Sequence, residues 1–303
     1  MVEKSCKLLI IILLAASVDV CAADFTAIFS ENPCMVLSVQ DTSKPSQKVA
    51  KPKKERLSKG AKKVTFESFE ANYARAMRYY NNQQFLSAAG LFEDLYPLSL
   101  GTPRADTILF LFAHCYYMNA DYTMAAFHFR DYVKRYPNSD RTEDAFYYCI
   151  SAINKSSADY NLDQSNTEYA IEQIKAFLIA YPNSKHVEEC NVMLDALRLK
   201  LARKNLEILK LYYNTDHYEA CQIAAKNFFN EYSYSPLMPE AIYYLVLNNY
   251  EYARKSVEKK KAERYRACLD ACNRLTLNYG ETKYTKEVEK IAADVQKHLQ
   301  KYN

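Results

Sequence analysis

The sequence has 303 residues, of which 49% are hydrophobic and 25% charged, a composition typical of a soluble chain long enough to bury a large core. Glycine is scarce, at 4 residues, tyrosine is abundant, at 27, and alternating apolar patterns are lacking, which favours an all-α protein. The net charge is +4, but nine basic residues lie from Lys44 to Lys63. Apart from these and Glu55, 31 basic and 35 acidic residues remain, which argues against a nucleic-acid-binding domain with a basic stripe on its fold.

Residues 1–22 are predicted to be a signal peptide. Lys4 and Lys7 precede an apolar run over residues 8–16. This run is too short to span a bilayer comfortably and has the length of the hydrophobic region of an export signal. We therefore expect the chain to be exported.

Two routes of processing remain open at the end of this segment. Signal peptidase could cut after Ala22, or Cys21 could become the acylated first residue of a lipoprotein. Lipoproteins normally carry glycine, alanine or serine before that cysteine, whereas this chain has Val20. Acylation of Cys21 would anchor the protein to a membrane.

Residues 23–64 are predicted to form a basic, disordered tether. They contain three prolines, several serines and the lysine-rich stretch, without a sustained apolar period. The simpler interpretation is a solvated linker. The alternative is attraction of the lysines to anionic lipid headgroups, at about 1 kcal/mol per basic residue near the surface.

A degenerate tyrosine motif recurs through the rest of the chain. Tyr-Pro-Asn-Ser at residues 136–139 returns at 181–184, more loosely as Tyr-Ser-Tyr-Ser at 232–235 and Tyr-Gly-Glu-Thr at 279–282, and Tyr-Pro at 96–97 begins the series. The spacings between the tyrosines are 40, 45, 51 and 47 residues. Because each motif follows a helical pattern, we interpret it as a helix stop that ends one helical hairpin in a stack.

The clearest copy of the repeat covers residues 105–139. A first helix, here called helix A, and a second, helix B, are separated by a turn at residues 119–122. Ala113 on helix A and Ala125 on helix B are small enough to let the two helices approach closely, and aromatic residues fill the space beside them. This pattern resembles the tetratricopeptide repeat.

The predicted fold is an all-α, right-handed superhelical solenoid over residues 65–303. It consists of about five helix-turn-helix repeats, each alike in pattern, followed by a helix that caps the open end. The repeats cover about residues 66–100, 105–139, 143–184, 190–235 and 239–282, and the cap covers residues 285–302.

The nine cysteines do not suggest a disulfide framework. Six fall on predicted helices at places where a small core residue would fit, and a free cysteine behaves as a small buried hydrophobe; they are Cys115, Cys149, Cys190, Cys221, Cys268 and Cys272. Since the sequence has neither a CxxC pair nor a Cys/His cluster with zinc spacing, we expect no metal site.

Signals of catalysis are weak. None of the five histidines pairs with a cysteine, serine or aspartate in a recognisable catalytic frame, and the glycines are too scattered for a phosphate-binding loop. We therefore expect a non-enzymatic protein without a cofactor, whose function depends on a binding surface.

In repeats of this class, certain helix A positions line a concave face. They are predicted here to be Tyr73, Met77 and Tyr80 in the first repeat, Phe110, His114, Tyr117 and Met118 in the second, Phe146, Ile150 and Asn154 in the third, and Leu206, Lys210 and Tyr213 in the fourth. An aromatic and methionine-rich groove in the first two repeats would suit an extended peptide with aromatic or apolar anchors. The alternative is that neighbouring helices bury these rings.

Several stretches resemble the BamD family of outer-membrane β-barrel assembly lipoproteins. They are Ala-Ala-Gly-Leu-Phe-Glu-Asp-Leu at 88–95, Leu-Asp-Gln-Ser at 162–165, Leu-Tyr-Tyr at 211–213 and the charged stretch 257–265. The resemblance in sequence covers about residues 66–295. The order of features, an export signal followed by five repeats, also resembles that of the family. Residue Val20 and the long basic tether depart from the family pattern.

The resemblance implies a place on the periplasmic face of the outer membrane of a Gram-negative bacterium, with Cys21 as the candidate lipid anchor. It implies that the N-terminal repeats receive the aromatic C-terminal signal of unfolded outer-membrane β-barrel proteins. It further implies that the C-terminal repeats dock to a BamA-type barrel insertase, and that other assembly lipoproteins are candidate partners. Charged residues that suit such docking are Arg254, Lys255, Arg264 and Arg266.

Two other functions are considered. An exported repeat scaffold of a peptidoglycan or other cell-envelope complex would share the fold and the compartment, but a coiled-coil N-terminus would favour it and residues 24–64 show no heptads. A glycan-binding lipoprotein would need tryptophan-lined sugar platforms, and the sequence has no tryptophan.

Overall fold

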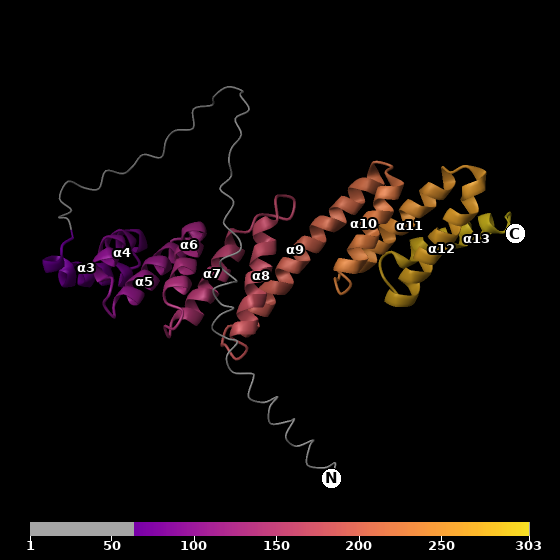
Figure 1. The fold of residues 1–303 in the computed structure, drawn as a ribbon. Coiled ribbons are helices and arrows are strands. Elements are labelled where there is room, and N and C mark those ends of the chain that lie inside the picture. Colours follow the sequence, from indigo (N-terminus) through magenta and orange to yellow (C-terminus); the bar gives the residue numbers. More distant parts are fainter. Residues whose placement is uncertain (1–63, 303) are drawn as a thin grey trace, which may run out of the picture. The chain divides into compact units, whose positions relative to one another are not determined.

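The computed structural model describes residues 64–302, and over this range the secondary structure is entirely helical (Figure 1). The elements are the 3-10 helix η1 (Phe66–Ser68) and the α-helices α3 (Phe69–Asn81), α4 (Phe85–Ser99), α5 (Ala105–Met118), α6 (Tyr122–Arg135), α7 (Thr142–Ser156), α8 (Ser165–Ala180), α9 (Val187–Asn214), α10 (Tyr218–Glu231), α11 (Met238–Arg254), α12 (Glu258–Tyr279) and α13 (Thr285–Leu299). The prediction of an all-α fold of tetratricopeptide-like helical repeats is confirmed. The predicted signal peptide, Cys21 and the predicted basic tether up to Lys63 lie outside the described residues.

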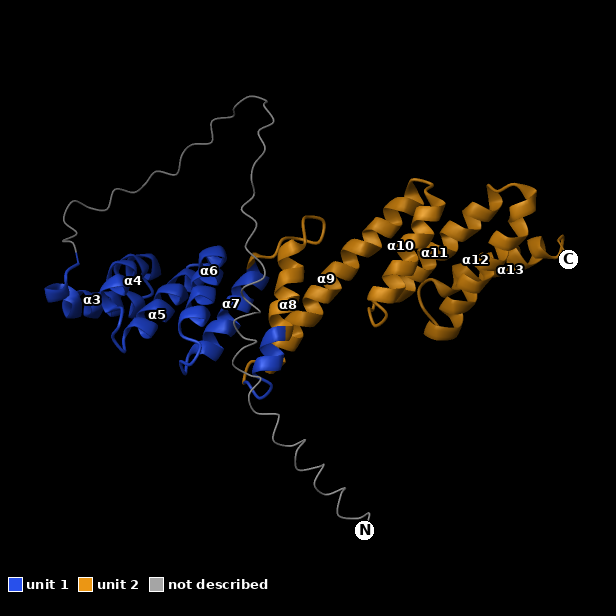
Figure 2. Cartoon of the chain, in the orientation of Figure 1, with its two compact units in different colours: residues 1–155, 176–184 blue, residues 156–175, 185–303 orange. Residues whose placement is uncertain are grey.

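The helices fall into two compact units (Figure 2). Of the described residues, the first unit holds 64–155 and 176–184, and the second holds 156–175 and 185–302. Each unit has its own buried core. The handedness of a superhelix through both units stays a prediction.

Small residues let the paired helices pack closely, as the repeat pattern predicts. Ala113 on α5 and Ala125 on α6 are fully buried, as are Ala76 and Ala88 in the preceding pair. Larger side chains such as Phe92 fill the space around these contacts and are also fully buried. This close packing is what positions the exposed faces of the first helices in each repeat.

Cysteines occupy the same kind of small, buried place. The six cysteines predicted to be core residues are all free and buried. Burial raises the pKa of the Cys115 thiol to about 12, and it raises that of Cys221, which lies in the core of the second unit, to about 12. Such thiols stay protonated at neutral pH and behave as apolar side chains.

The turn between helices A and B contains one residue in the left-handed backbone conformation in each of three repeats. Gln83, Ala120 and Asp216 each have φ of 60°, in the left-handed region. In the second repeat the Ala120 N–H donates to the Tyr117 carbonyl (3.1 Å) and the next N–H donates to the Tyr116 carbonyl (3.0 Å). This bonding satisfies carbonyls at the end of helix A and reverses the chain within a few residues.

Replacing Ala120 by glycine should stabilise the protein by about 0.5–1 kcal/mol. The left-handed backbone costs an L-residue roughly 1–2 kcal/mol, and the greater flexibility of glycine in the unfolded chain cancels only part of the gain. The measurement is the urea midpoint of the full-length chain, followed by far-UV circular dichroism. Ala74→Gly, in the middle of α3, is the control and should destabilise by roughly 0.5–1 kcal/mol. An unchanged or lower midpoint for Ala120→Gly would show that the turn is not strained.

The helix stops between repeats follow the tyrosine motif, with one correction. Helices α6, α8 and α10 end directly before Tyr136, Tyr181 and Tyr232, and α12 ends at Tyr279, directly before Gly280, whose φ is 58°. In the first repeat, however, the predicted stop at residues 96–97 is wrong, because α4 continues through Pro97 to Ser99.

The reason is the place of Pro97 in the last turn of α4. A proline lacks the N–H that bonds to the preceding turn, and its ring crowds the carbonyl four residues back, so the helix continues for only two residues beyond Pro97. The Ser99 hydroxyl donates to the Tyr96 carbonyl (2.7 Å), and the Thr102 N–H donates to the Ser99 carbonyl (3.0 Å). The Ser139 N–H makes the equivalent bond in the second repeat, so the step between these two repeats is 37 residues.

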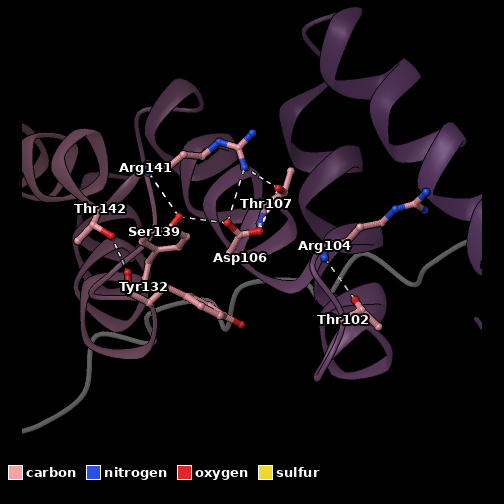
Figure 3. Close-up of polar contacts among 9 residues, drawn as sticks. Thr102, Arg104, Asp106, Thr107, Tyr132, Ser139, Arg141 and Thr142 are labelled. Atoms are coloured by element: carbon pink, nitrogen blue, oxygen red, sulfur yellow. Dashed lines mark hydrogen bonds and ion pairs between the residues drawn. The ribbon is translucent and has the colours of Figure 1, made fainter.

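The serine that closes the Tyr-Pro-Asn-Ser motif joins three elements (Figure 3). The Ser139 hydroxyl donates to the Asp106 carboxylate on α5 (3.1 Å) and lies 2.9 Å from the Tyr132 hydroxyl on α6. One repeat later, the Ser184 hydroxyl donates to the Glu143 carboxylate at the start of α7 (2.5 Å). The motif therefore ends helix B and also attaches its end to the start of helix A in the same repeat.

Candidate functional site

The 37-residue step gives the register of helix A in the first unit. It places Tyr80 and Tyr117 at equivalent positions near the ends of α3 and α5, and His114 and Ser151 at equivalent positions one turn earlier on α5 and α7. Hydrogen bonds confirm this register. The Tyr80 hydroxyl lies 2.9 Å from His114 Nδ1, and the Tyr117 hydroxyl lies 2.8 Å from Ser151 Oγ.

This register corrects part of the predicted concave face. Phe146 and Ile150 are 1% and 0% exposed and belong to the core. They occupy the positions of buried Leu109 and Ala113, so the sequence prediction was one residue out of register in the third repeat. Tyr147 is the true equivalent of Phe110.

In the fourth repeat, Leu206 was also predicted to line the face, and it is fully buried in the core of the second unit. Lys210 and Tyr213 are half-buried on the same helix, α9, and Asn154 is half-buried on α7. Leu206 is therefore a core residue, whereas Phe110 at the same place of the second repeat stays partly exposed.

Four of the predicted binding residues come together in one group of rings on α5 and its neighbours. We call this group the aromatic cluster; its members are Tyr80, Phe110, His114, Tyr117 and Tyr148. The His114 ring is central, with its centroid 5.8 Å from that of Tyr80, 6.2 Å from that of Phe110 and 5.1 Å from that of Tyr148. All five rings are half-buried, so each keeps part of its surface open to solvent.

Fully buried rings on α6 pack against two members of the cluster. Phe110 meets Phe129 and Tyr132 edge to face, at centroid distances of 5.6 and 5.7 Å. Tyr148 stacks on the same Phe129 at 5.4 Å. Since Phe129 and Tyr132 are 0% exposed, the surface rings rest on a rigid base.

Tyr148 was missed by the sequence analysis. It lies on α7 beside Tyr147 and occupies the position of Leu111 one repeat earlier, which the predicted set of helix A positions did not include. The sequence carries no positional signal for it, because the tyrosine pairs at 79–80 and 116–117 lie at another place of the repeat.

The remaining predicted binding residues lie at the edges of this group. Tyr73 is half-buried, stacks on Phe69 with centroids 6.4 Å apart, and has the Arg104 guanidinium 5.5 Å above its ring. Met77 is half-buried on α3, and Met118 is 49% exposed at the end of α5. They extend the apolar surface without joining the ring contacts of His114.

Electrostatically, the cluster favours neutral groups. Burial lowers the pKa of His114, so that its ring is neutral at pH 7 and Nδ1 can accept the proton of the Tyr80 hydroxyl. Burial, helped by Cys115 and Tyr148 nearby, raises the pKa of Tyr80. A charged neighbour is Lys155 at the end of α7, whose Nζ lies 4.4 Å from the centre of the Tyr117 ring.

A neutral aromatic surface of this kind can bind apolar or aromatic side chains through burial and ring contacts. Among the described residues, no group of three or more histidine, cysteine, aspartate or glutamate side chains could hold a metal ion.

Two of the four charged residues predicted to dock a partner also make contacts within the second unit. Lys255 Nζ lies 3.0 Å from both carboxylate oxygens of Asp216 and 2.5 Å from the Tyr218 hydroxyl. These bonds, first that of Tyr218, raise the pKa of Lys255. Arg264 donates to the Tyr252 hydroxyl (2.5 Å) and lies 3.5 Å above its ring. Both residues therefore hold helices of the unit together.

The other two are more accessible. Arg254 is exposed and pairs with Glu251 on its own helix (2.8 Å). Arg266 is exposed on α12. Since a helix turns by about 100° per residue, Arg266 leaves α12 on a different side from Arg264. Arg264 and Arg266 thus do not share one face of α12.

Two cavities lie at helix-stop motifs, one in each unit. The first, of about 540 Å³, is lined by residues of the α4–α5 connection and of the motif at 136–139, next to the contacts of Asp106 drawn in Figure 3. The second, of about 840 Å³, is lined by α9 and residues 231–236, where Tyr234 is fully exposed. The repeated motif was recognised from the sequence, but the cavities were not.

Comparison with known proteins agrees with this architecture. A family model described as outer membrane lipoprotein (YfiO) matches residues 67–220 and 206–303, which together cover the described repeats. The chain belongs to this family. Membership associates it with the outer membrane, as the sequence analysis expected.

A relative in Caulobacter vibrioides is the outer membrane protein assembly factor BamD, which is 24% identical over 133 residues. The match covers 44% of this chain and 44% of that protein, so it spans less than half of the relative's length. Over the described residues, no helix is both long and apolar enough to cross a membrane.

Proposed function

We propose that this chain is a binding component of the machinery that assembles β-barrel proteins in the outer membrane. Membership of the outer membrane lipoprotein family, together with the similarity to BamD, supports a role in outer-membrane protein assembly. In this proposal the first unit receives unfolded barrel proteins, and the second docks to a BamA-type barrel insertase on the periplasmic face of the membrane. Cys21, acylated, would anchor the chain, and residues 23–64 would connect the anchor to the repeats.

The observation that carries the proposal is the aromatic cluster. Its rings stand on helices α3, α5 and α7, which are fixed to one another by hydrogen bonds from Tyr80 to His114 and from Tyr117 to Ser151. An unfolded segment that places an aromatic side chain against these rings removes apolar surface from water on both partners. Because the rings are already held in place, little side-chain freedom is lost on binding.

A variant with Tyr80→Ala and Tyr117→Ala should bind the C-terminal peptide of an outer-membrane barrel protein at least tenfold more weakly than the wild type. Central aromatic side chains of an interface contribute about 1–2 kcal/mol or more each. The measurement is fluorescence polarisation of a labelled peptide with the full-length protein.

The control for this experiment is Tyr79→Ala with Tyr116→Ala, the directly preceding tyrosines. They lie on other sides of the same helices, where Tyr79 contacts Arg75 and Tyr116 stacks on His128. The control should keep its peptide affinity, and unfolding midpoints of both double variants confirm that they are folded. Equal affinity of the Tyr80/Tyr117 variant and the wild type would remove the cluster as the binding site.

The partner complex is tested by mild crosslinking of the protein in outer membranes, detergent purification and mass spectrometry. We expect a large barrel insertase with periplasmic repeats, and other assembly lipoproteins with it. Recovery of peptidoglycan synthases without an insertase would contradict the proposal and support the envelope-scaffold alternative. Crosslinking positions on Arg254 and Arg266 are preferred, because Lys255 and Arg264 are engaged within the unit.

A further inference from the structure

One charged side chain, Lys155, touches the aromatic cluster. Lys155 stands in the last turn of α7 and is exposed. Its Nζ lies 4.4 Å from the centre of the Tyr117 ring and 5.2 Å from the centre of the Tyr122 ring. Two tyrosine rings therefore hold the ammonium in place by cation–π contact.

Several other cations of this unit are neutralised by a carboxylate. Arg104 lies 2.5 Å from Glu70, Arg135 lies 2.8 Å from Asp131, and Arg141 lies 4.0 Å from Asp106. The contacts of Lys155 among the described residues are instead with phenol groups. Its pKa is raised first by a hydrogen bond with Tyr117 and further by Tyr117, Tyr122 and Tyr148. The ammonium is thus fully charged, positioned, and without an internal carboxylate on the described chain.

The Lys155 ammonium adjoins the apolar surface of the aromatic cluster. Tyr117 joins the ammonium to the rest of the cluster, since its ring lies 5.1 Å from that of Tyr148 and 6.2 Å from that of His114. A ligand that contacts the rings and pairs with the ammonium at the same time must carry an aromatic group and a carboxylate close together. In an extended chain, side chains of adjacent residues point to opposite sides, so an aromatic residue followed by an acidic one separates the two groups. An aromatic residue at the very end of a polypeptide carries both groups on one residue.

We propose that Lys155 pairs with the free C-terminal carboxylate of an unfolded polypeptide that ends in an aromatic residue, and so distinguishes a chain end from an internal aromatic residue. This inference rests on the proposed function, because it names the part of the client that the same cluster recognises. The carboxylate replaces water around an ammonium that the tyrosines already hold, which makes a charge-assisted hydrogen bond.

The test uses one peptide that ends in phenylalanine, prepared as the free acid and as the C-terminal amide, with the full-length protein. The wild type should bind the acid about tenfold more tightly than the amide, the size expected for one charge-assisted hydrogen bond. Lys155→Met should bind both forms with the affinity that the wild type has for the amide. Lys155→Arg keeps the charge and should retain most of the preference.

The control is Arg78→Met, which removes an exposed positive charge on α3 of the same unit and should leave the acid-to-amide ratio unchanged. A Lys155→Met variant that still prefers the acid tenfold would overturn the inference while leaving the proposed function intact, since both peptides still bind. A wild type that binds neither form would overturn the proposed function itself.

Discussion

Phe129→Ala should lower the free energy of unfolding by about 3–5 kcal/mol, because truncation of a fully buried phenylalanine removes its burial energy and leaves a cavity. Phe129 is 0% exposed on α6. Its ring supports two members of the aromatic cluster, Phe110 at 5.6 Å and Tyr148 at 5.4 Å. The variant should therefore also lose affinity for an aromatic-ended peptide, although Phe129 itself does not reach the surface.

The measurement is urea unfolding of the full-length chain by far-UV circular dichroism, which suits a protein without tryptophan. Phe127→Ala is the matched control, since it removes the same group from the same helix where the side chain is 53% exposed. It should cost no more than about 1 kcal/mol. Equal losses for the two variants would mean that α6 does not pack as described.

Lys210→Glu should destabilise the second unit by about 3 kcal/mol or more. Lys210 Nζ lies 2.6 Å from Glu240 on α11 and 3.1 Å from Glu207 on its own helix. The side chains of Lys210 and Glu240 are only 14% and 20% exposed, so solvent screens the pair weakly. The reversal removes the shared cation and places three carboxylates together, and an uncompensated charge at such a site is costly.

The pH dependence of this effect follows from the pKa shifts. Burial alone would lower the pKa of Lys210, but its bonds to Glu240 and Glu207 outweigh burial and raise it. Burial likewise opposes ionisation of Glu240, yet Lys210 lowers its pKa below the ordinary value. A carboxyl with a lowered pKa contributes stability above its unfolded pKa of about 4.3. This contribution is lost as the pH falls from there through the folded pKa.

Two variants complete this experiment. Lys226→Glu, an exposed reversal on α10, should change stability by no more than about 0.5 kcal/mol. The exchange Lys210→Glu with Glu240→Lys should recover part of the loss, because it restores opposite charges across α9 and α11. If the single reversal unfolds at the wild-type midpoint at pH 7, the pair makes no net contribution.

The sequence by itself determined the features that depend on local chemistry. The helical period, the small residues at Ala113 and Ala125, and the recurrent helix stops at Tyr136 and Tyr181 indicated stacked helical hairpins, and the structure confirms them. Six cysteines on apolar helix faces are buried and free, as their positions predicted. These properties are decided within a few residues along the chain, by side-chain size and turn chemistry, so they can be recognised without the fold.

Only the tertiary structure decided which side chains meet. One residue of error turns a helix face by about 100°, which is why Phe146 was predicted to line the surface in place of Tyr147. The bond from Tyr80 to His114 spans 34 residues, and the contact of Lys155 with Tyr117 joins the ends of helices A in two successive repeats. Likewise, Lys255 is held by Asp216 from another helix. Such pairings depend on the exact length of each repeat and on the packing of neighbouring helices, which the local pattern of a degenerate repeat does not specify.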